Sequence, residues 1–529
     1  MTAKYFDVIV LGRSIGALMT AALLARRDFT VLVLGQGAKP ASYKLKNFTL
    51  QRRAFTMLAA TSPSWTRMLA ELAQTQTWNR LVQPASPMMQ VLAPRRRLDI
   101  PPDMALFGRE IDREMPEVRR VIDELYAELA RVNGSADEAF DRDAVWPPGT
   151  FWERRETGRY AAMLPYVRAE PDADLLVEFP RGHFFRNVVT TSVLFATNLG
   201  SLPPPFAVAR LHGAFTRGLY TLNGGEDELE RFLEGRIAAH GGKCMFEGKA
   251  RALHMRRGSL GGVVIDGDDA PTGANFIITD LDGEGVAALS QGEGIHKRAQ
   301  REWPRITSSV GRFVVSLCVR DAGLPAPLGV ESFVLPADRQ PPRPARVGIP
   351  VSRSSAATLP FRPAIHLQRM PMPGASKESL LVAEVLLPDR SPLPIGQMRE
   401  IVLSTLGAEL PFLERHLLAV DSVHDGLPPW VCEDGRLYMA DRWSRSGAGA
   451  AAETLVRQLD VDPPGYLGLG GEPIRGPIER TLLVGRSVLP GLGQEGQLLA
   501  AWGAARLVTR TDRRKERMRR DMWSKVEFG

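Results

Sequence analysis

The sequence of 529 residues has few of the residues and motifs that mark several common protein classes. Its three cysteines, Cys244, Cys318 and Cys432, lie far apart, so no disulfide framework or metal-binding spacing can be read, and a reducing compartment is expected. Its eight histidines include no H-x-x-x-H or H-E-x-x-H pair, which disfavours a metal site. No G-x-x-x-x-G-K-[ST] loop occurs, and no apolar run reaches the ~20 residues of a membrane-spanning helix.

Composition is that of a folded globular protein. Hydrophobic residues make up 44% and charged residues 24%, and at ~150 residues per domain the length corresponds to three or four domain-sized units. The net charge is +7, but residues 506–529 hold nine Arg/Lys against four Asp/Glu, which leaves only +2 on the rest. This near-neutral body argues against a nucleic-acid partner. The first residues lack a secretory signal pattern, so we expect a cytoplasmic protein.

The chain opens with a nucleotide-binding pattern. Phe6–Leu11 is a short apolar run typical of a buried parallel strand, and apolar residues at helical spacing follow the loop that starts at Gly12. Val31–Leu34 is a second buried strand, which completes a β-turn-α-β unit. Such a unit points a helix N-terminus at an anion, typically a pyrophosphate. The predicted contacts are Gly12, Arg13, Ser14, Gly16 and Ala17.

Three positions depart from the G-x-G-x-x-G fingerprint and the acid that follows it, although Ala17 at the third glycine is a common variant. Ser14 replaces the second glycine, and Gly35, followed by Gln36, stands where an acid normally binds the ribose hydroxyls. A Rossmann unit that binds no dinucleotide therefore stays an alternative. Gly12–Gly16 also matches G-x-S-x-G, the nucleophile elbow of α/β-hydrolases. That hydrolase hypothesis is disfavoured because the motif follows the first strand, and no Asp or His stands out as a partner for Ser14.

Later segments add elements in a definite order. Residues 88–100 predict two short strands, 118–132 an amphipathic helix, and 250–266 a hairpin. Asn223-Gly224-Gly225 precedes a predicted helix that ends near Ala239, and residues 275–280 predict another strand. The segment 184–206 is interpreted as core, with a tunnel wall or membrane-facing cap as the alternative. A helix is expected to start at Glu453, and Thr481–Gly485 leads through Pro490–Gly493 into a final helix over 496–508.

This order resembles the carotenoid (phytoene) desaturase family, within the flavin-dependent amine-oxidase-like superfamily. The resemblance covers nearly the whole chain and implies an α/β fold, with a discontinuous Rossmann-like FAD-binding domain and an inserted α+β substrate domain. The FAD-type pieces are expected at 1–84, 216–290 and 431–508, the substrate or cap pieces at 85–215 and 291–430, and a basic tail at 509–529. The implied activity is an FAD-dependent oxidoreductase that acts by hydride transfer on an apolar isoprenoid or polyene-like substrate.

The resemblance also implies cofactor contacts. Ala250 would lie beside the adenine, and the closing contacts with the pyrophosphate and ribityl chain would fall at Gly485, Arg486, Ser487 and Gly493. No catalytic acid or base can be named.

Several family features are replaced. Pro40-Ala41-Ser42 and Gln51-Arg52-Arg53 stand where the family has Pro-Gly-Gly and Asp-x-Gly. In the closing motif the family has a histidine before the proline and another proline three residues after it, whereas here Leu489 precedes Pro490, and Gln494-Glu495 follow Gly493. The loops Gly12-Arg13-Ser14 and Gly485-Arg486-Ser487 carry matching arginines. These two guanidiniums form either a rebuilt phosphate clamp or pairs with local acids.

Two further hypotheses stay open. The chain is alternatively a non-catalytic homologue that has lost flavin binding and serves as a lipid-binding or partner subunit; a nicotinamide enzyme is disfavoured by Gly35. The tail combines Met518, Met522 and Trp523 with many arginines. This basic amphipathic pattern predicts contact with a protein partner or with the inner face of a membrane.

Overall fold

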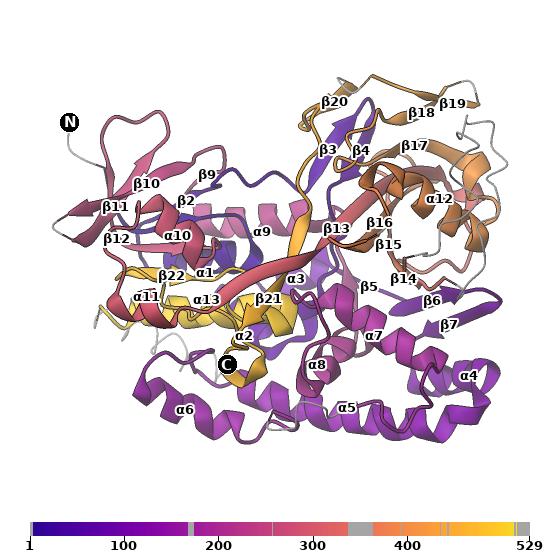
Figure 1. Ribbon diagram of the computed structural model, residues 1–529, viewed down its shortest axis with the longest axis horizontal. Coiled ribbons are helices and arrows are strands. Elements are labelled where there is room, and N and C mark those ends of the chain that lie inside the picture. The colour runs from indigo at the N-terminus through magenta and orange to yellow at the C-terminus, as the bar shows by residue number, and fades with distance from the viewer. Residues whose placement is uncertain are drawn as a thin grey trace.

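A computed structural model gives the structure of residues 4–167, 174–256, 258–336, 363–391, 393–433, 435–441, 444–512 and 515. Within these residues, seven strands form a first sheet drawn from three distant parts of the chain (Figure 1). Its order is β10-β11-β12-β1-β2-β9, with β22 also paired to β12. The strands are β1 (Tyr5–Leu11), β2 (Val31–Leu34), β9 (Lys243–Met245), β10 (Ala250–Arg256), β11 (Ser259–Ile265), β12 (Thr272–Thr279) and β22 (Thr481–Leu483).

Helices cover this sheet because its central strands are apolar on both faces. β1 lies between β2 and β12, parallel to both, and Val8, Ile9 and Val10 are fully buried. Helix α1 (Ile15–Arg26) packs against α9 (Gly225–Ala239) and α13 (Gly493–Thr509). Nearly every residue of α1 is buried, as expected for a helix that is apolar all round.

A second sheet of ten described strands lies beside the first and is bridged to it by the long strand β13 (Arg305–Arg320) (Figure 1). Its order is β19-β18-β17-β13-β16-β15-β14-β6-β7, with β21 also paired to β13. The other strands are β6 (Met89–Ala93), β7 (Arg96–Ile100), β14 (Glu331–Val334), β15 (Ile365–Pro371), β16 (Glu378–Pro388), β17 (Leu417–Asp421), β18 (Trp430–Glu433), β19 (Arg436–Met439) and β21 (Val456–Asp462).

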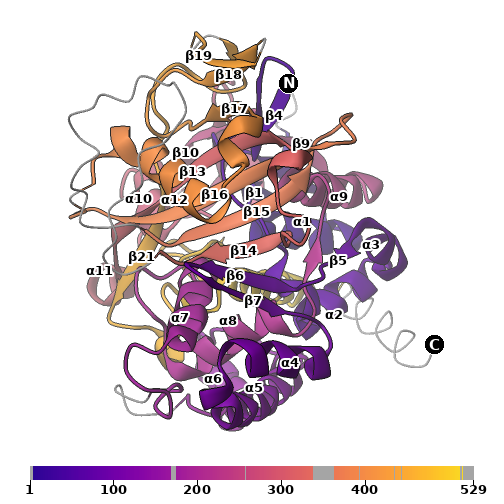
Figure 2. The ribbon, with the colours of Figure 1, turned by 90° about the vertical axis from the view of Figure 1, so that its right-hand side faces the viewer.

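A group of helices lies under the second sheet, with α5 (Arg119–Phe140) and α6 (Phe151–Ala161) outermost (Figure 2). The others are α4 (Met104–Glu114), α7 (Phe184–Ala196) and α8 (Pro205–Thr216). In α7, Phe185, Val188 and Val193 are buried. The segment 184–206 therefore contributes to the core, as the sequence indicated. Small elements complete the chain: β3 (Ser42–Leu45), β4 (Phe48–Gln51), β5 (Gln83–Pro84), β8 (Tyr220–Thr221), β20 (Arg445–Ser446), α2 (Pro63–Glu71), α3 (Thr75–Leu81), α10 (Gly283–Leu289), α11 (Lys297–Glu302) and α12 (Met398–Glu409).

The predicted fold class is confirmed: a Rossmann-like domain built from separate chain segments carries an inserted α+β portion. The predicted helix from Glu453 is wrong. Residues 456–462 form β21, because they pair antiparallel with β13 over most of their length. Apart from Lys515, the tail from residue 513 lies outside the described residues. None of the described helices is long and apolar enough to cross a membrane.

Candidate functional site

The carboxyl ends of the parallel strands β1, β2, β12 and β22 meet at one edge of the first sheet, which is where α/β folds of this kind bind ligands. We call this edge, with loop 12–17, residues 35–36, Ala250 and loop 484–487, the dinucleotide site. The opening and closing loops are in contact there. A Cβ on Gly16 would collide with the Val484 carbonyl, and a Cβ on Gly485 with the backbone of Asp280. Gly16 therefore allows the two loops to pack together, and Gly485 allows the closing loop to pack against the residue that follows β12.

The chain's own groups bind the start of α1. The Ser14 hydroxyl accepts a hydrogen bond from the Ala17 N–H at 3.3 Å, as an N-cap. The Asp280 carboxylate accepts from the Ser14 N–H at 2.8 Å and lies against Gly12, whose φ of 123° requires glycine. Burial raises the pKa of Asp280. The Asp280 carboxyl already takes the Ser14 N–H that this loop would otherwise offer to a phosphate.

At the predicted adenine position, Ala250 is already hydrogen-bonded. The Gln36 side-chain NH₂ donates to the Ala250 carbonyl at 2.9 Å, and its carbonyl accepts from the Ala250 N–H at 2.9 Å. A carboxamide presents one donor beside one acceptor, as the N6/N1 edge of adenine does. Ala250 is fully buried. Gln36 therefore satisfies both backbone groups that an adenine ring would use.

The position of the missing ribose acid is covered by backbone. The Gly35 N–H donates to the Met245 carbonyl at 3.3 Å, and a Cβ on Gly35 would collide with the carbonyl of Phe246. The chain after β9 thus passes directly over the end of β2. No carboxylate fits at residue 35 without moving this backbone.

Two ion pairs connect the loops around the dinucleotide site to α9. Arg13 pairs with Glu230, and Arg53 pairs with Glu226 one helical turn earlier. The Arg13 guanidinium also lies 4.3 Å from the centre of the Phe246 ring. Burial raises the pKa of Glu230 to about 7 against the effect of Arg13. Arg13 Nε and Glu230 Oε1 have no hydrogen-bond partner among the described residues, which leaves a donor and an acceptor for a small polar molecule such as water.

The residues of the closing loop make their hydrogen bonds to other parts of the chain than Arg13 does. Arg486 donates to Asn198 Oδ1 at 3.0 Å and to the Arg457 carbonyl at 2.8 Å, and its burial lowers its pKa to about 10. Ser487 is buried. Gly493 has φ of 56° and lies against the Ala196 carbonyl. Because Arg13 bonds to α9 and Arg486 to the chain after α7 and to β21, the two guanidiniums have separate partners in this structure.

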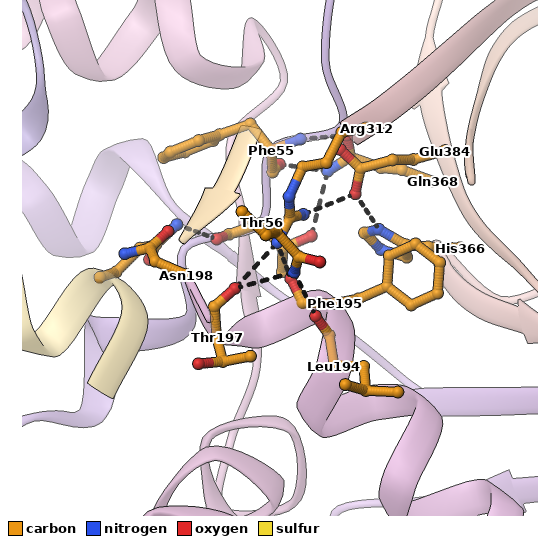
Figure 3. Close-up of polar contacts among 12 residues, drawn as sticks. Phe55, Thr56, Leu194, Phe195, Thr197, Asn198, Arg312, His366, Gln368 and Glu384 are labelled. Atoms are coloured by element: carbon orange, nitrogen blue, oxygen red, sulfur yellow. Dashed lines mark hydrogen bonds and ion pairs between the residues drawn. The ribbon is translucent and has the colours of Figure 1, made fainter. Parts of the chain in front are cut away.

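A buried charged cluster that no local sequence pattern signals lies between the second sheet and α7 (Figure 3). Arg312 donates to Glu384 at 2.9 Å and to the carbonyls of Phe195 and Thr197. His366 bonds Glu331 on one side and approaches Glu384 at 3.4 Å on the other. Although burial opposes it, the two carboxylates raise the pKa of His366 to about 9. Every member of this cluster is paired, which suits a structural connection.

Comparisons place this geometry among known folds. A family model described as an NAD(P)-binding Rossmann-like domain matches residues 10–72. Three solved structures align with the whole chain. An oxidoreductase from Methanosarcina mazei is 16% identical over 93% of this chain and 98% of its own, with a TM-score of 0.56. A putrescine oxidase with redesigned cofactor binding is 13% identical over 96% and 99%, with a TM-score of 0.55. A protein from Pyrococcus furiosus is 12% identical over 95% and 97%, with a TM-score of 0.52.

The chain has the fold of FAD-dependent oxidoreductases of the amine-oxidase type. Comparison with the sequences of curated proteins finds no match. At these identities the similarity shows the fold alone, so the resemblance to carotenoid desaturases stays a prediction.

The residues of the dinucleotide site do not fit FAD, the group that this fold implies. Gln36 occupies the adenine contacts of Ala250, and backbone covers the place of the ribose acid. The Asp280 carboxyl lies beside the phosphate-binding loop. We therefore derive no flavin-dependent step for this chain.

Proposed function

We propose that this chain is a binding protein built on the fold of FAD-dependent oxidoreductases, and that it works without flavin. The observation that carries the proposal is the two-fold hydrogen bond between the Gln36 side chain and the Ala250 backbone. Adenine would have to displace a carboxamide that already satisfies both buried groups. Each displaced hydrogen bond costs ~0.5–1.5 kcal/mol, and the adenine contact would return little more than that.

The glycines of the closing motif are compatible with this proposal. Gly485 packs against the Asp280 backbone, and Gly493 adopts a positive φ against the Ala196 carbonyl. A side chain at either position would clash whether or not flavin is bound. Their presence in the sequence therefore follows from packing within the chain and carries no weight for a cofactor.

An absorption spectrum tests the proposal directly. The protein is purified, incubated with excess FAD and passed through gel filtration, and the visible spectrum of the protein peak is recorded. We expect no flavin band. A stoichiometric flavin band would overturn the proposal and favour the predicted desaturase-like oxidoreductase. In that event Arg13→Ala and Arg486→Ala should weaken FAD binding, and apolar polyenes become the substrates to screen.

A further inference from the structure

Helix α6 lies at the outer edge of the molecule (Figure 1), and it begins with two exposed aromatic residues. Phe151 is 72% exposed and Trp152 is 70% exposed, with ring centres 5.4 Å apart. Met163, just after the helix, is 50% exposed. Large neighbouring apolar side chains on an open helix face mark an interaction surface more often than isolated ones do.

The acidic side chains of α6 are paired with other segments, whereas its arginines make no ion pair with the described residues. Glu153 accepts from Arg475 at 2.6 Å, and Glu156 accepts from Arg506 at 2.9 Å, so both acids of the helix are neutralised by other segments. Three arginines, Arg154, Arg155 and Arg159, are exposed and make no ion pair with the described residues. The helix therefore combines exposed aromatic rings with exposed positive charge, and the Arg155 guanidinium lies 6.0 Å from the centre of the Trp152 ring. We call Phe151, Trp152 and these three arginines the α6 surface.

A cavity of about 480 Å³ opens beside this surface. Its lining is mostly apolar and includes Pro147, Ala161, Val167 and Leu467. Its two charged residues are Arg154 and Glu472, and Glu472 already accepts hydrogen bonds from the Gly283 N–H and the Trp303 ring. Gly158 of α6 also lines it, and a Cβ on Gly158 would meet no atom within 4 Å. This volume lies in the range of small-ligand pockets. An apolar cavity with a guanidinium at its border matches a lipid, which has an apolar chain and an anionic headgroup.

We propose that the α6 surface docks on an anionic phospholipid membrane, and that the cavity beside it takes one acyl chain. Aromatic side chains favour the level of the lipid headgroups, and each arginine near an anionic surface adds attraction. This inference deepens the proposed flavin-free binding function and names its ligand class. It places membrane contact on α6, whereas the sequence pattern suggested the tail.

Co-sedimentation with vesicles tests the docking. The full chain is mixed, at fixed ionic strength, with one of two kinds of vesicle. One contains phosphatidylcholine alone, and the other also contains 30 mol% phosphatidylglycerol, which gives it the negative surface of an anionic leaflet. We expect tight binding only to the anionic vesicles. Phe151→Ser with Trp152→Ser should weaken it by at least about tenfold, and changing the three arginines to Gln should lower it about fivefold per residue. Phe412→Ser is the matched control, since Phe412 is 60% exposed and lies next to the distant helix α12.

Two results would overturn the docking proposal. One is equal binding to neutral and anionic vesicles. The other is wild-type binding by both α6 variants, which would assign the membrane contact to another surface such as the tail. Unchanged circular dichroism spectra would show that the variants fold.

The cavity has its own test. Gly158→Phe places a ring in open space at the cavity lining. We expect this variant to lose the fluorescently labelled phosphatidylglycerol that the wild type retains through gel filtration. Retention by the variant, or none by the wild type, would contradict the acyl-chain site. Flavin absorbance is read on the same samples, so failure of lipid binding is distinguishable from failure of the flavin-free function.

Discussion

The side-chain carboxamide of Gln36 occupies the backbone groups of Ala250 that an adenine ring would use. Its removal is therefore the sharpest test of the dinucleotide site at the scale of residues. Gln36→Ala leaves the buried N–H and C=O of Ala250 without partners, and each costs ~1–3 kcal/mol. We expect the free energy of unfolding in urea to fall by about 2 kcal/mol. Millimolar adenosine should restore part of this loss in the variant and have no effect on the wild type.

The control separates this effect from backbone strain. Gln291 has the same φ of 54° as Gln36, but its side chain is exposed. Gln291→Ala should therefore report only the cost of alanine at a positive φ. Equal losses in the two variants would mean that the pairing with Ala250 adds no stability.

Sequence reasoning found the positions of this site but not their contacts. Gly35 and Gln36 were recognised as departures from a ribose-binding end, and Ala250 was placed beside the adenine through a family resemblance. No pattern indicated that Gln36 reaches Ala250, because 214 residues separate them and the contact depends on a left-handed backbone at Gln36. Glu230 was missed because a glutamate within a helix is ordinarily exposed, and because 217 residues separate it from Arg13.

At the scale of elements, the loop before α1 is connected to α9 by the pair of Arg13 and Glu230, whose side chains are 12% and 7% exposed. Removing one partner from a buried pair leaves an uncompensated charge, at a cost of ~3–5 kcal/mol. We expect Arg13→Met to lower the free energy of unfolding by about 3 kcal/mol at pH 8. The double variant Arg13→Met with Glu230→Leu should return to within ~1 kcal/mol of the wild type.

Two comparisons check this double-mutant cycle. At pH 6 the cost of Arg13→Met should shrink, because the pKa of Glu230 is about 7 and the carboxyl then takes up a proton. The exposed pair of Arg298 and Glu302 should show a coupling of only ~0.5 kcal/mol. Additive effects of the two Arg13 and Glu230 changes would contradict the connection between the loop and α9.

Elements with strong local signals were predicted well. The opening strand and helix, the hairpin of β10 and β11, and helices α9 and α13 lie where apolar periodicity placed them. The segment from Glu453 was misread because an Ala-rich stretch precedes it, whereas pairing with β13 decides its structure. Such tertiary pairing has no local signal in the sequence.

At the scale of the whole molecule, the cluster around His366 joins parts of the chain that are distant in sequence. Thr56 donates to Glu331 at 2.6 Å, and Arg312 reaches the carbonyls at the end of α7. The second sheet is thereby connected both to the segment after β4 and to the helices below it. The protonation of His366 should consequently affect the stability of the whole fold.

This connection predicts a pH dependence with a definite sign. The pKa of His366 is about 9 in the folded chain, against about 6.5 when unfolded. The folded state therefore holds the proton more tightly, so the stabilisation is complete below pH 6.5 and is lost as the pH rises through 9. The difference corresponds to roughly 3 kcal/mol across this interval.

Urea unfolding of the wild type at pH 6 and pH 9.5 should show this loss. His366→Gln should be less stable at pH 6 and should lose most of the wild-type slope, with the remaining slope near pH 7 assigned to Glu230, whose pKa is about 7. The control His296→Gln should follow the wild type. A wild-type slope that persists in full in His366→Gln would assign the pH dependence to other groups. It would also leave the His366 cluster without a role in joining the second sheet to α7 and to the segment after β4.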